Sequence, residues 1–253
     1  MMSAEKALRA SAHAAFILIV VGFWEYSAQQ GWLDATFFGR PLGIASYLWR
    51  GFYIDGQLWL ELGYTLMGAA LSFVGGAVAA TAVGLVFTML PRLNRVAEPY
   101  LTFFNAMPRI ALAPLFLLWF GLGIGSKIAV GISLTFFIVL SATVAGIRSV
   151  NSDHLILSRA LGATPAQIFL KVTMPSAVPV IFSGLRLGLI FALLGVVGAE
   201  LIAAEHGLGQ TLAYLQSTFN TDGVMALLAL LAVLGLCTTS FMNRIERALL
   251  AWQ

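Results

Sequence analysis

Arg109 is the residue of this sequence whose type and position are best suited to chemistry. It interrupts the apolar run "NAMPRIALAPLFLLWF" and lies between Pro108 and Pro114. In a predicted helix over 97–121 it would lie about 18 Å from the start, near the middle of a bilayer. An arginine there is costly and should face water or the interior of a helical bundle. The two flanking prolines, Pro108 and Pro114, are expected to break the helix beside a pathway. Two interpretations of Arg109 stay open: a pathway wall that meets polar or anionic solutes, or an anchor bonded to backbone carbonyls.

Glu200 is the second charged residue that could meet a solute inside the membrane. It lies near the C-terminal end of a predicted helix over 182–204, so we expect it close to the outer face. Because Arg109 is predicted near the middle of the bilayer, the difference in depth makes an ion pair between Glu200 and Arg109 unfavourable. Both residues stay candidates for lining a translocation pathway. The other charges near predicted helix ends are interpreted as interface residues: Glu25, Glu61 and Lys127.

No group of residues in the sequence fits a catalytic or metal-binding pattern. His13, His154 and His206 are scattered, and the single cysteine, Cys237, lies in an apolar run. The glycines of "GLGIGS" at 121–126 are not followed by the lysine of a phosphate-binding loop. We therefore expect a chain that is not an enzyme and has no metal or other cofactor, so that any ATP is bound by a partner subunit.

The elements that position these charges are predicted to be membrane-spanning helices. Of the 253 residues, 60% are hydrophobic and 10% are charged, whereas about a quarter are charged in a typical soluble domain. Apolar runs near the ~20 residues that cross a bilayer recur six times: 12–30, 62–90, 97–121, 127–148, 182–204 and 223–243. We expect an all-α, polytopic membrane helical bundle that forms one domain over 1–253.

The second span carries a face of small residues, spaced three and four apart. This pattern predicts close packing of helices in lipid, and the residues are Gly68, Ser72, Gly75, Gly76, Ala80 and Gly84.

The basic residues predict the orientation of the spans. With a cytoplasmic N-terminus, ten basic residues fall inside: Lys6, Arg9, Arg92, Arg95, Arg148, Arg159, Lys171, Arg186, Arg244 and Arg247. Only Arg40, Arg50 and Lys127 fall outside, which fits the positive-inside rule. Six spans then return the C-terminus to the cytoplasm. Because there is no run of Lys or Arg, nucleic acid is not an expected partner.

A polar island, "SRALGATPAQIFLKVTMPSAVP" over 158–179, separates two apolar spans on the predicted cytoplasmic side. We expect Ser152 to cap a first short helix that runs through Leu161. Gly162 suits the left-handed position that ends such a helix.

A second short helix is predicted after this corner. Thr164, Pro165 and Gln167 have the spacing of a capping box with proline at the first helical position. Met174-Pro175 is expected to stop the helix. The two helices carry apolar surface on Leu155, Ile156, Leu157, Leu161, Ile168, Phe169 and Val172. Helices this short are unstable alone, so they either pack on their own bundle or dock into a partner's groove.

The island resembles the EAA loop of the permeases of ATP-binding-cassette (ABC) importers. Gly162 is followed by "VTMP" and "VP" before "GLRLGL". The segments "AEPYLTFFNAMPRIALAPLFLLWFGLG" and "GVVGAELIAAEHGLG" are similar to the nitrate/sulfonate/taurine permease family, and the likeness covers most of 58–243. The Glu-Ala-Ala of the loop falls on Ile156, Leu157 and Ser158, so its acidic residue is missing here.

The resemblance implies the MetI-like fold of type I ABC importer permeases. It also implies that a cytoplasmic loop over about 149–180 couples the chain to an ATPase. The residues it assigns to coupling are Ser158, Leu161, Gly162, Ala163, Thr164, Pro165, Ile168, Phe169 and Pro175.

The implied protein is a subunit of the bacterial inner membrane with both termini in the cytoplasm. Its partners would be two ATPase subunits, a second copy of the chain, a periplasmic or lipid-anchored solute-binding protein, and membrane lipid. The solute would be a small organic anion such as a sulfonate or taurine, nitrate or an aromatic acid, or a thiamine-precursor pyrimidine. The alternative is a self-contained secondary transporter or channel, although the chain has no inverted repeat and no paired mid-membrane carboxylates.

Overall fold

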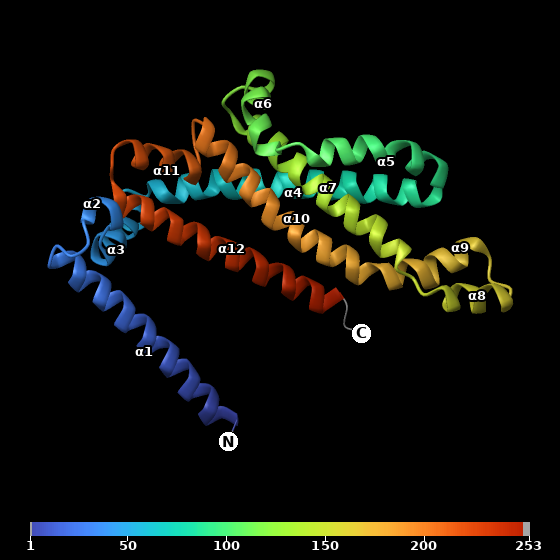
Figure 1. Ribbon diagram of the computed structural model, residues 1–253, viewed down its shortest axis with the longest axis horizontal. Coiled ribbons are helices and arrows are strands. Elements are labelled where there is room, and N and C mark those ends of the chain that lie inside the picture. Colours follow the sequence, from blue (N-terminus) through green and yellow to red (C-terminus); the bar gives the residue numbers. More distant parts are fainter. Residues whose placement is uncertain (1, 250–253) are drawn as a thin grey trace. The chain divides into compact units, whose positions relative to one another are not determined.

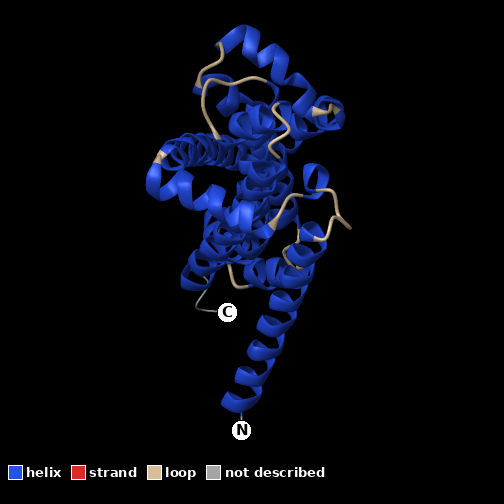
Figure 2. Ribbon diagram, turned by 90° about the vertical axis from the view of Figure 1, so that its left-hand side faces the viewer, coloured by secondary structure: helices blue, strands red, loops and turns tan. Residues whose placement is uncertain are grey.

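The computed structural model describes residues 2–249, with side chains from residue 11 onward. Within that range every regular element is a helix, which confirms the predicted all-α class (Figure 2). The chain separates into two compact units. The first comprises the chain up to Glu61 together with Thr211–Ala232, and the second comprises Leu62–Gln210 and the chain from Val233 onward.

The first unit is tied together by polar contacts between chain segments distant in sequence. Its helices are α1 (Met2–Gln29), α2 (Ala35–Phe38), α3 (Pro41–Trp49), η1 (Arg50–Ile54), the start of α4 (Gln57–Met89), most of α11 (Leu208–Ser217) and the first part of α12 (Thr221–Leu249). The carboxylate of Asp222 accepts the backbone N–H of Arg40 at 2.6 Å. Glu25 on α1 accepts the N–H of Leu42 at 3.0 Å, so it ties α1 to the start of α3.

The second unit is built around α7 (Ile124–Arg148) and α10 (Met174–Ile202), which lie side by side (Figure 1). It also contains the rest of α4, α5 (Pro91–Ala106), η2 (Arg109–Leu112), α6 (Ala113–Phe120), α8 (Ser152–Ala160), α9 (Pro165–Ile168), η3 (Phe169–Thr173) and the end of α12. Glycines let α7 and α10 approach closely, because a Cβ on Gly188 would lie 2.8 Å from a methyl group of Val139.

The small-residue face of α4 packs against α7 of the same chain. A Cβ on Gly76 would lie 2.8 Å from Cβ of Thr135, so no larger residue fits there without a shift. The hydroxyl of Ser72 donates to the carbonyl of Ile128 at 3.3 Å. The prediction of close helix packing is therefore confirmed, and the packing is within the chain.

Five helical runs are long and apolar enough to cross a membrane: Ser11–Gln29, Gln57–Met89, Ile124–Arg148, Pro165–Ile202 and Thr221–Leu249. The predicted continuous span over 97–121 is wrong. α5 and the segment Arg109–Phe120 meet at a bend of 82°, and they make a sixth span only if the bent pair counts as one.

The bend follows from Pro108, as the sequence predicted. Met107 has an extended backbone, with φ −69° and ψ 136°, because a proline disfavours the helical conformation of the residue before it. The break expected at Pro114 is not present, since Pro114 lies in the first turn of α6, where a missing N–H costs nothing.

Candidate functional site

The first candidate site is the corner between α8 and α9, which projects beyond the ends of α7 and α10 (Figure 1). The N-cap of α8 is Asn151 and not Ser152 as predicted, because the Asn151 side chain accepts the N–H of Asp153 at 2.8 Å. Asn and Ser cap helices about equally well, so the sequence alone permits either Asn151 or Ser152 as the N-cap of this helix.

Gly162 ends α8 in the left-handed conformation, with φ +77°. Its N–H donates to the carbonyl of Arg159 at 3.0 Å, and the N–H of Ala163 donates to the carbonyl of Ser158 at 3.0 Å. These two bonds make a Schellman motif, which satisfies carbonyls that the helix end leaves free. The predicted conformation of Gly162 is confirmed, and Ser158 and Ala163 belong to the same motif.

The predicted capping box at the start of α9 is confirmed. The hydroxyl of Thr164 accepts the N–H of Gln167 at 3.3 Å, and the side chain of Gln167 accepts the N–H of Thr164 at 2.8 Å. Pro165 occupies the first turn, where its fixed φ favours the helix. The corner therefore has a defined shape on both sides of Gly162 and Ala163.

Pro175 does not stop the second helix, contrary to the prediction. The run from Pro165 to Ile202 is continuous and passes through the π turn η3. The N–H of Met174 bonds the carbonyl of Phe169, five residues back. A π turn widens the helix just ahead of Pro175, and so relieves the clash that a proline ring makes with the carbonyl four residues back.

The corner exposes apolar side chains. Leu161 is 78% exposed, Ile156 62% and Leu157 59%, whereas Ile168 and Phe169 are half-buried. The exposed set is not covered by any part of the chain that the structure describes. Of the two interpretations left open by the sequence, packing on its own bundle fails for these three side chains.

The second candidate site is a buried cluster around Glu200. This residue is 1% exposed, and its carboxylate lies 3.5 Å from the ammonium of Lys127, which is 2% exposed. The hydroxyl of Thr65 donates to the carboxylate at 2.9 and 3.1 Å from its two oxygens. The N–H of Gly209 donates to the carboxylate at 3.0 Å. The cluster therefore joins α4, α7 and α10 to the segment that follows α10.

The same cluster fixes the backbone of residues 206–209. Lys127 donates to the carbonyl of His206, and the N–H of Leu208 donates to the hydroxyl of Thr65 at 2.9 Å. Gly207 has φ +121°, and the Glu200 carboxylate occupies the space that a Cβ there would need. A side chain at position 207 would therefore displace the charge at the centre of the cluster.

Interpreting Lys127 as an interface residue was wrong, because it is buried against an acid. The sequence could have indicated this ion pair, because Lys127 and Glu200 are both predicted near the outer ends of their spans. Two opposite charges at one depth in lipid are expected to pair. Glu61 is also buried, at 4% exposed.

Arg109 lies in η2, just beyond the bend at Pro108. Its Nη2 donates to the side chain of Asn105 at 2.5 Å and to the carbonyl of Asn105 at 3.0 Å. Its guanidinium lies 4.3 Å from the ring centre of Phe137 on α7, and its Nε is buried without a hydrogen-bond partner among the described residues. Arg109 and Glu200 thus have separate partners, and Arg109 caps the C-terminal end of α5.

Comparison with known proteins identifies relatives along most of the chain. Residues 72–250 match the family described as binding-protein-dependent transport system inner membrane component. The chain is 30% identical over 246 residues to the formylaminopyrimidine transport permease protein of Halalkalibacterium halodurans, with 94% of each chain covered. It is also 30% identical over 200 residues to the taurine transport system permease protein of Escherichia coli, covering 79% of this chain and 73% of that one.

A solved structure shows the same fold. A chain of the MetNI methionine ABC transporter, in an inward-facing conformation, superposes with a TM-score of 0.65 at 23% identity. The match covers 76% of this chain and 95% of that one, and it confirms the predicted importer-permease fold. Since the family match spans more than half of the sequence and the relatives are permeases, this chain belongs to the binding-protein-dependent inner membrane components, the permeases of ABC importers.

Proposed function

We propose that this permease forms a translocation pathway together with a second copy of itself and is driven by two separate ATPase subunits. The observation that carries the proposal is the corner at Gly162. It has a rigid backbone, defined by the Schellman motif and the capping box, and it presents three exposed apolar side chains. A rigid apolar corner outside the membrane suits a groove on a partner protein.

The proposed coupling loop, about residues 149–180, is continuous with the membrane helices on both sides. α7 ends at Arg148 just before it, and the run from Pro165 to Ile202 leads out of it without a break. A push on the corner can therefore move α10 as a rigid body, in the manner of a hinged helix. Pro175 belongs to the proposed coupling loop because the π turn ahead of it accommodates its ring, and it does not end the helix.

The proposed orientation places the loop and both termini in the cytoplasm of a bacterial cell. It is supported by the ten basic residues that fall on that side when the N-terminus is inside. A solute-binding protein, periplasmic or lipid-anchored, would deliver the solute to the opposite face, as the family description implies.

The proposed solute is a small organic anion, such as a sulfonate or taurine, nitrate or an aromatic acid, or a thiamine-precursor pyrimidine. The names of the relatives, a formylaminopyrimidine permease and a taurine permease, support this range. Pro108 and Arg109 are proposed to border the pathway, because the break in the helix exposes backbone there. Glu200 has its oxygens engaged by three partners, which favours a positioning role over contact with the solute.

Substitution of Gly162 tests the coupling proposal. No atom lies within 4 Å of a Cβ placed on Gly162, so a substitution there acts through backbone strain alone. A β-branched residue in the left-handed region is strained by about 1–2 kcal/mol, whereas Asn tolerates that region. Gly162→Val is expected to weaken co-purification of the ATPase or to uncouple ATP hydrolysis from uptake, and Gly162→Asn should be close to wild type.

Gly31 supplies the matched control. It has φ +74°, and no atom lies within 4 Å of its Cβ position either, but it is far from the proposed loop in sequence. Gly31→Val should leave attachment and coupling unchanged. Full attachment and full coupled uptake in Gly162→Val would show that the corner is not the coupling element.

A further inference from the structure

A groove of about 390 Å³ lies in the second unit, between α4, α10 and the last part of α12. Its lining is almost entirely apolar and consists of Leu66, Ala69, Ala70, Leu189, Leu193, Leu234, Cys237, Thr238 and Phe241. The hydroxyl of Thr238 donates to the carbonyl of Leu234 at 2.7 Å within α12, so its hydrogen is already bonded. Because hydrocarbon tails are as apolar as leucine, the groove suits an acyl chain better than a polar solute.

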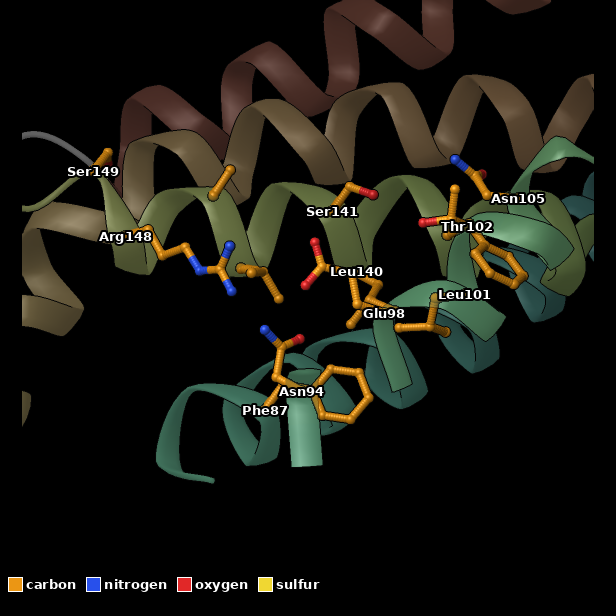
Figure 3. Close-up of a pocket in the computed structure, with 13 residues that line it drawn as sticks. Phe87, Asn94, Glu98, Leu101, Thr102, Asn105, Leu140, Ser141, Arg148 and Ser149 are labelled. Atoms are coloured by element: carbon orange, nitrogen blue, oxygen red, sulfur yellow. The ribbon is translucent and has the colours of Figure 1, made fainter. Parts of the chain in front are cut away.

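The larger cavity of the same unit is of a different kind. It measures about 560 Å³ and lies between the end of α4, α5 and α7, with Asn94, Glu98 and Arg148 in its lining (Figure 3). Glu98 and Arg148 are exposed, so neither charge requires a ligand. The apolar groove is therefore the more informative of the two.

Basic side chains continue the groove at the C-terminal end of α12. Arg244 follows the lining residue Phe241 by three positions, and Arg247 follows Arg244 by three more. Residues at this spacing lie on one face of a helix. Both arginines are exposed, and among the described residues neither forms an ion pair. This end of the groove therefore carries positive charge.

The acid at this end is already paired. Glu246 is the only acidic residue of the sequence between Asp222 and the end of α12, and it forms an ion pair with Arg186 on α10. Arg186 precedes the lining residue Leu189 by three positions, so the ion pair lies at the same end of the groove. Two positive charges, on Arg244 and Arg247, remain uncompensated there.

The length of the groove matches one leaflet of a bilayer. Arg244 lies ten residues after Leu234, at the far end of the lining of α12, which is about 15 Å along a helix. The hydrocarbon core of a bilayer is about 30 Å thick, and α12 is long and apolar enough to cross it. An acyl chain whose headgroup lies at Arg244 would therefore end near Leu234, close to the bilayer centre.

We propose that the groove binds one anionic phospholipid. Its acyl chain lies along α12 between α4 and α10, and its phosphate group pairs with Arg244 and Arg247. Basic sites between membrane helices attract anionic headgroups, whereas a zwitterionic lipid has the same chain but no net charge to balance two arginines. In the proposed orientation this lipid belongs to the cytoplasmic leaflet, and the inference goes beyond transport because it does not depend on the solute.

A second copy of the chain is a less suitable occupant of this groove. A two-fold axis along the membrane normal would bring the same face of each copy together at the same depth. Arg244 and Arg247 of the two copies would then face each other, and like charges in an interface are unfavourable. An anionic headgroup meets the same arginines with the opposite charge.

Cys237 allows a test on the wild-type protein. It is the single cysteine of the chain, it is exposed and it lines the groove, so its alkylation reports whether the groove is occupied. The permease, purified with its ATPase in a nonionic detergent, is treated with N-ethylmaleimide in the presence of phosphatidylglycerol or phosphatidylcholine with identical acyl chains. The intact mass of the permease gives the rate of reaction.

Phosphatidylglycerol should slow this reaction at lower concentration than phosphatidylcholine. Because each basic residue near the surface favours an anionic headgroup, half-protection of Cys237 should require about tenfold less of the anionic lipid. Equal protection by the two lipids would overturn the proposal. A thiol that does not react under any condition would also overturn it, because a second copy would then cover the groove.

The double variant Arg244→Gln/Arg247→Gln tests the headgroup. It should lose the preference for phosphatidylglycerol and keep the protection that phosphatidylcholine gives. Arg92→Gln is the matched control, since Arg92 is an exposed arginine outside the groove, and it should keep the preference. An unchanged preference in the double variant would show that the headgroup binds elsewhere.

A substitution that fills the groove tests the acyl chain. Ala70 lines the groove and is exposed, and Ala79 is exposed on the same helix outside it. Native mass spectrometry counts the phosphatidylglycerol that each purified complex retains. Ala70→Phe should retain less than wild type, and Ala79→Phe should retain as much as wild type. Equal retention by the two variants would place the acyl chain outside the groove and overturn the proposal.

Discussion

Removing one charge of the buried pair Lys127–Glu200 should destabilise the protein strongly. Lys127→Met leaves the carboxylate of Glu200 at 1% exposure and removes its cationic partner, while the hydroxyl of Thr65 and the N–H of Gly209 stay as neutral partners. An uncompensated buried charge costs far more than the pair contributes, because the desolvation of the remaining ion is no longer offset.

The size of the effect can be worked out from the burial of the pair. Breaking a buried ion pair by removing one partner costs about 3–5 kcal/mol. For a chain of this length, 1 kcal/mol lowers the melting temperature by about 2–4 °C, so Lys127→Met should melt about 6–20 °C below wild type. The double variant Lys127→Met/Glu200→Gln removes both charges, and it should lose less than the sum of the two single variants.

A more exposed ion pair is the matched control. Arg186 and Glu246 also form an ion pair, but their side chains are 33% and 21% exposed. An accessible pair contributes about 1 kcal/mol or less, so Arg186→Met should lower the melting temperature by only about 2–4 °C. Thermal unfolding is measured by fluorescence-detected size exclusion in one detergent. If Lys127→Met melts no lower than Arg186→Met, Lys127 and Glu200 are not a buried pair.

Three further outcomes are expected. Gly207→Ala should lower the melting temperature, since φ of +121° and an adjacent carboxylate leave no room for a methyl group; an unchanged value would contradict the geometry of the loop. Arg109→Ala should reduce uptake while the ATPase stays attached, if Arg109 borders the translocation pathway as we propose; normal uptake kinetics would favour a purely structural anchor, held by Asn105 and Phe137. In a Cys237→Ser background, a cysteine at Trp49 should react with an impermeant thiol reagent on intact cells, and one at Lys171 should not; labelling at 171 would reverse the proposed orientation.

The caps of the corner could be predicted because every bond in them is local. The Schellman motif at Gly162 and the capping box at Thr164 join residues at most five apart, so residue types at fixed spacings are sufficient. The same local reasoning was wrong at Pro175. Whether a proline ends a helix or is absorbed by a π turn depends on the packing of the whole run, and the sequence around Pro175 does not contain that information.

The approximate positions of five of the six predicted spans also followed from the sequence, since lipid requires each crossing segment to be apolar along its length. The pairing of Lys127 with Glu200 did not, because these residues are far apart in the chain and meet only when α7 packs on α10. The cavity lined by α5 and α7 likewise arises from the placement of these two helices. Hydropathy and caps are properties of neighbouring residues, whereas charge pairs and cavities are properties of helix faces, and only the tertiary structure decides which faces meet.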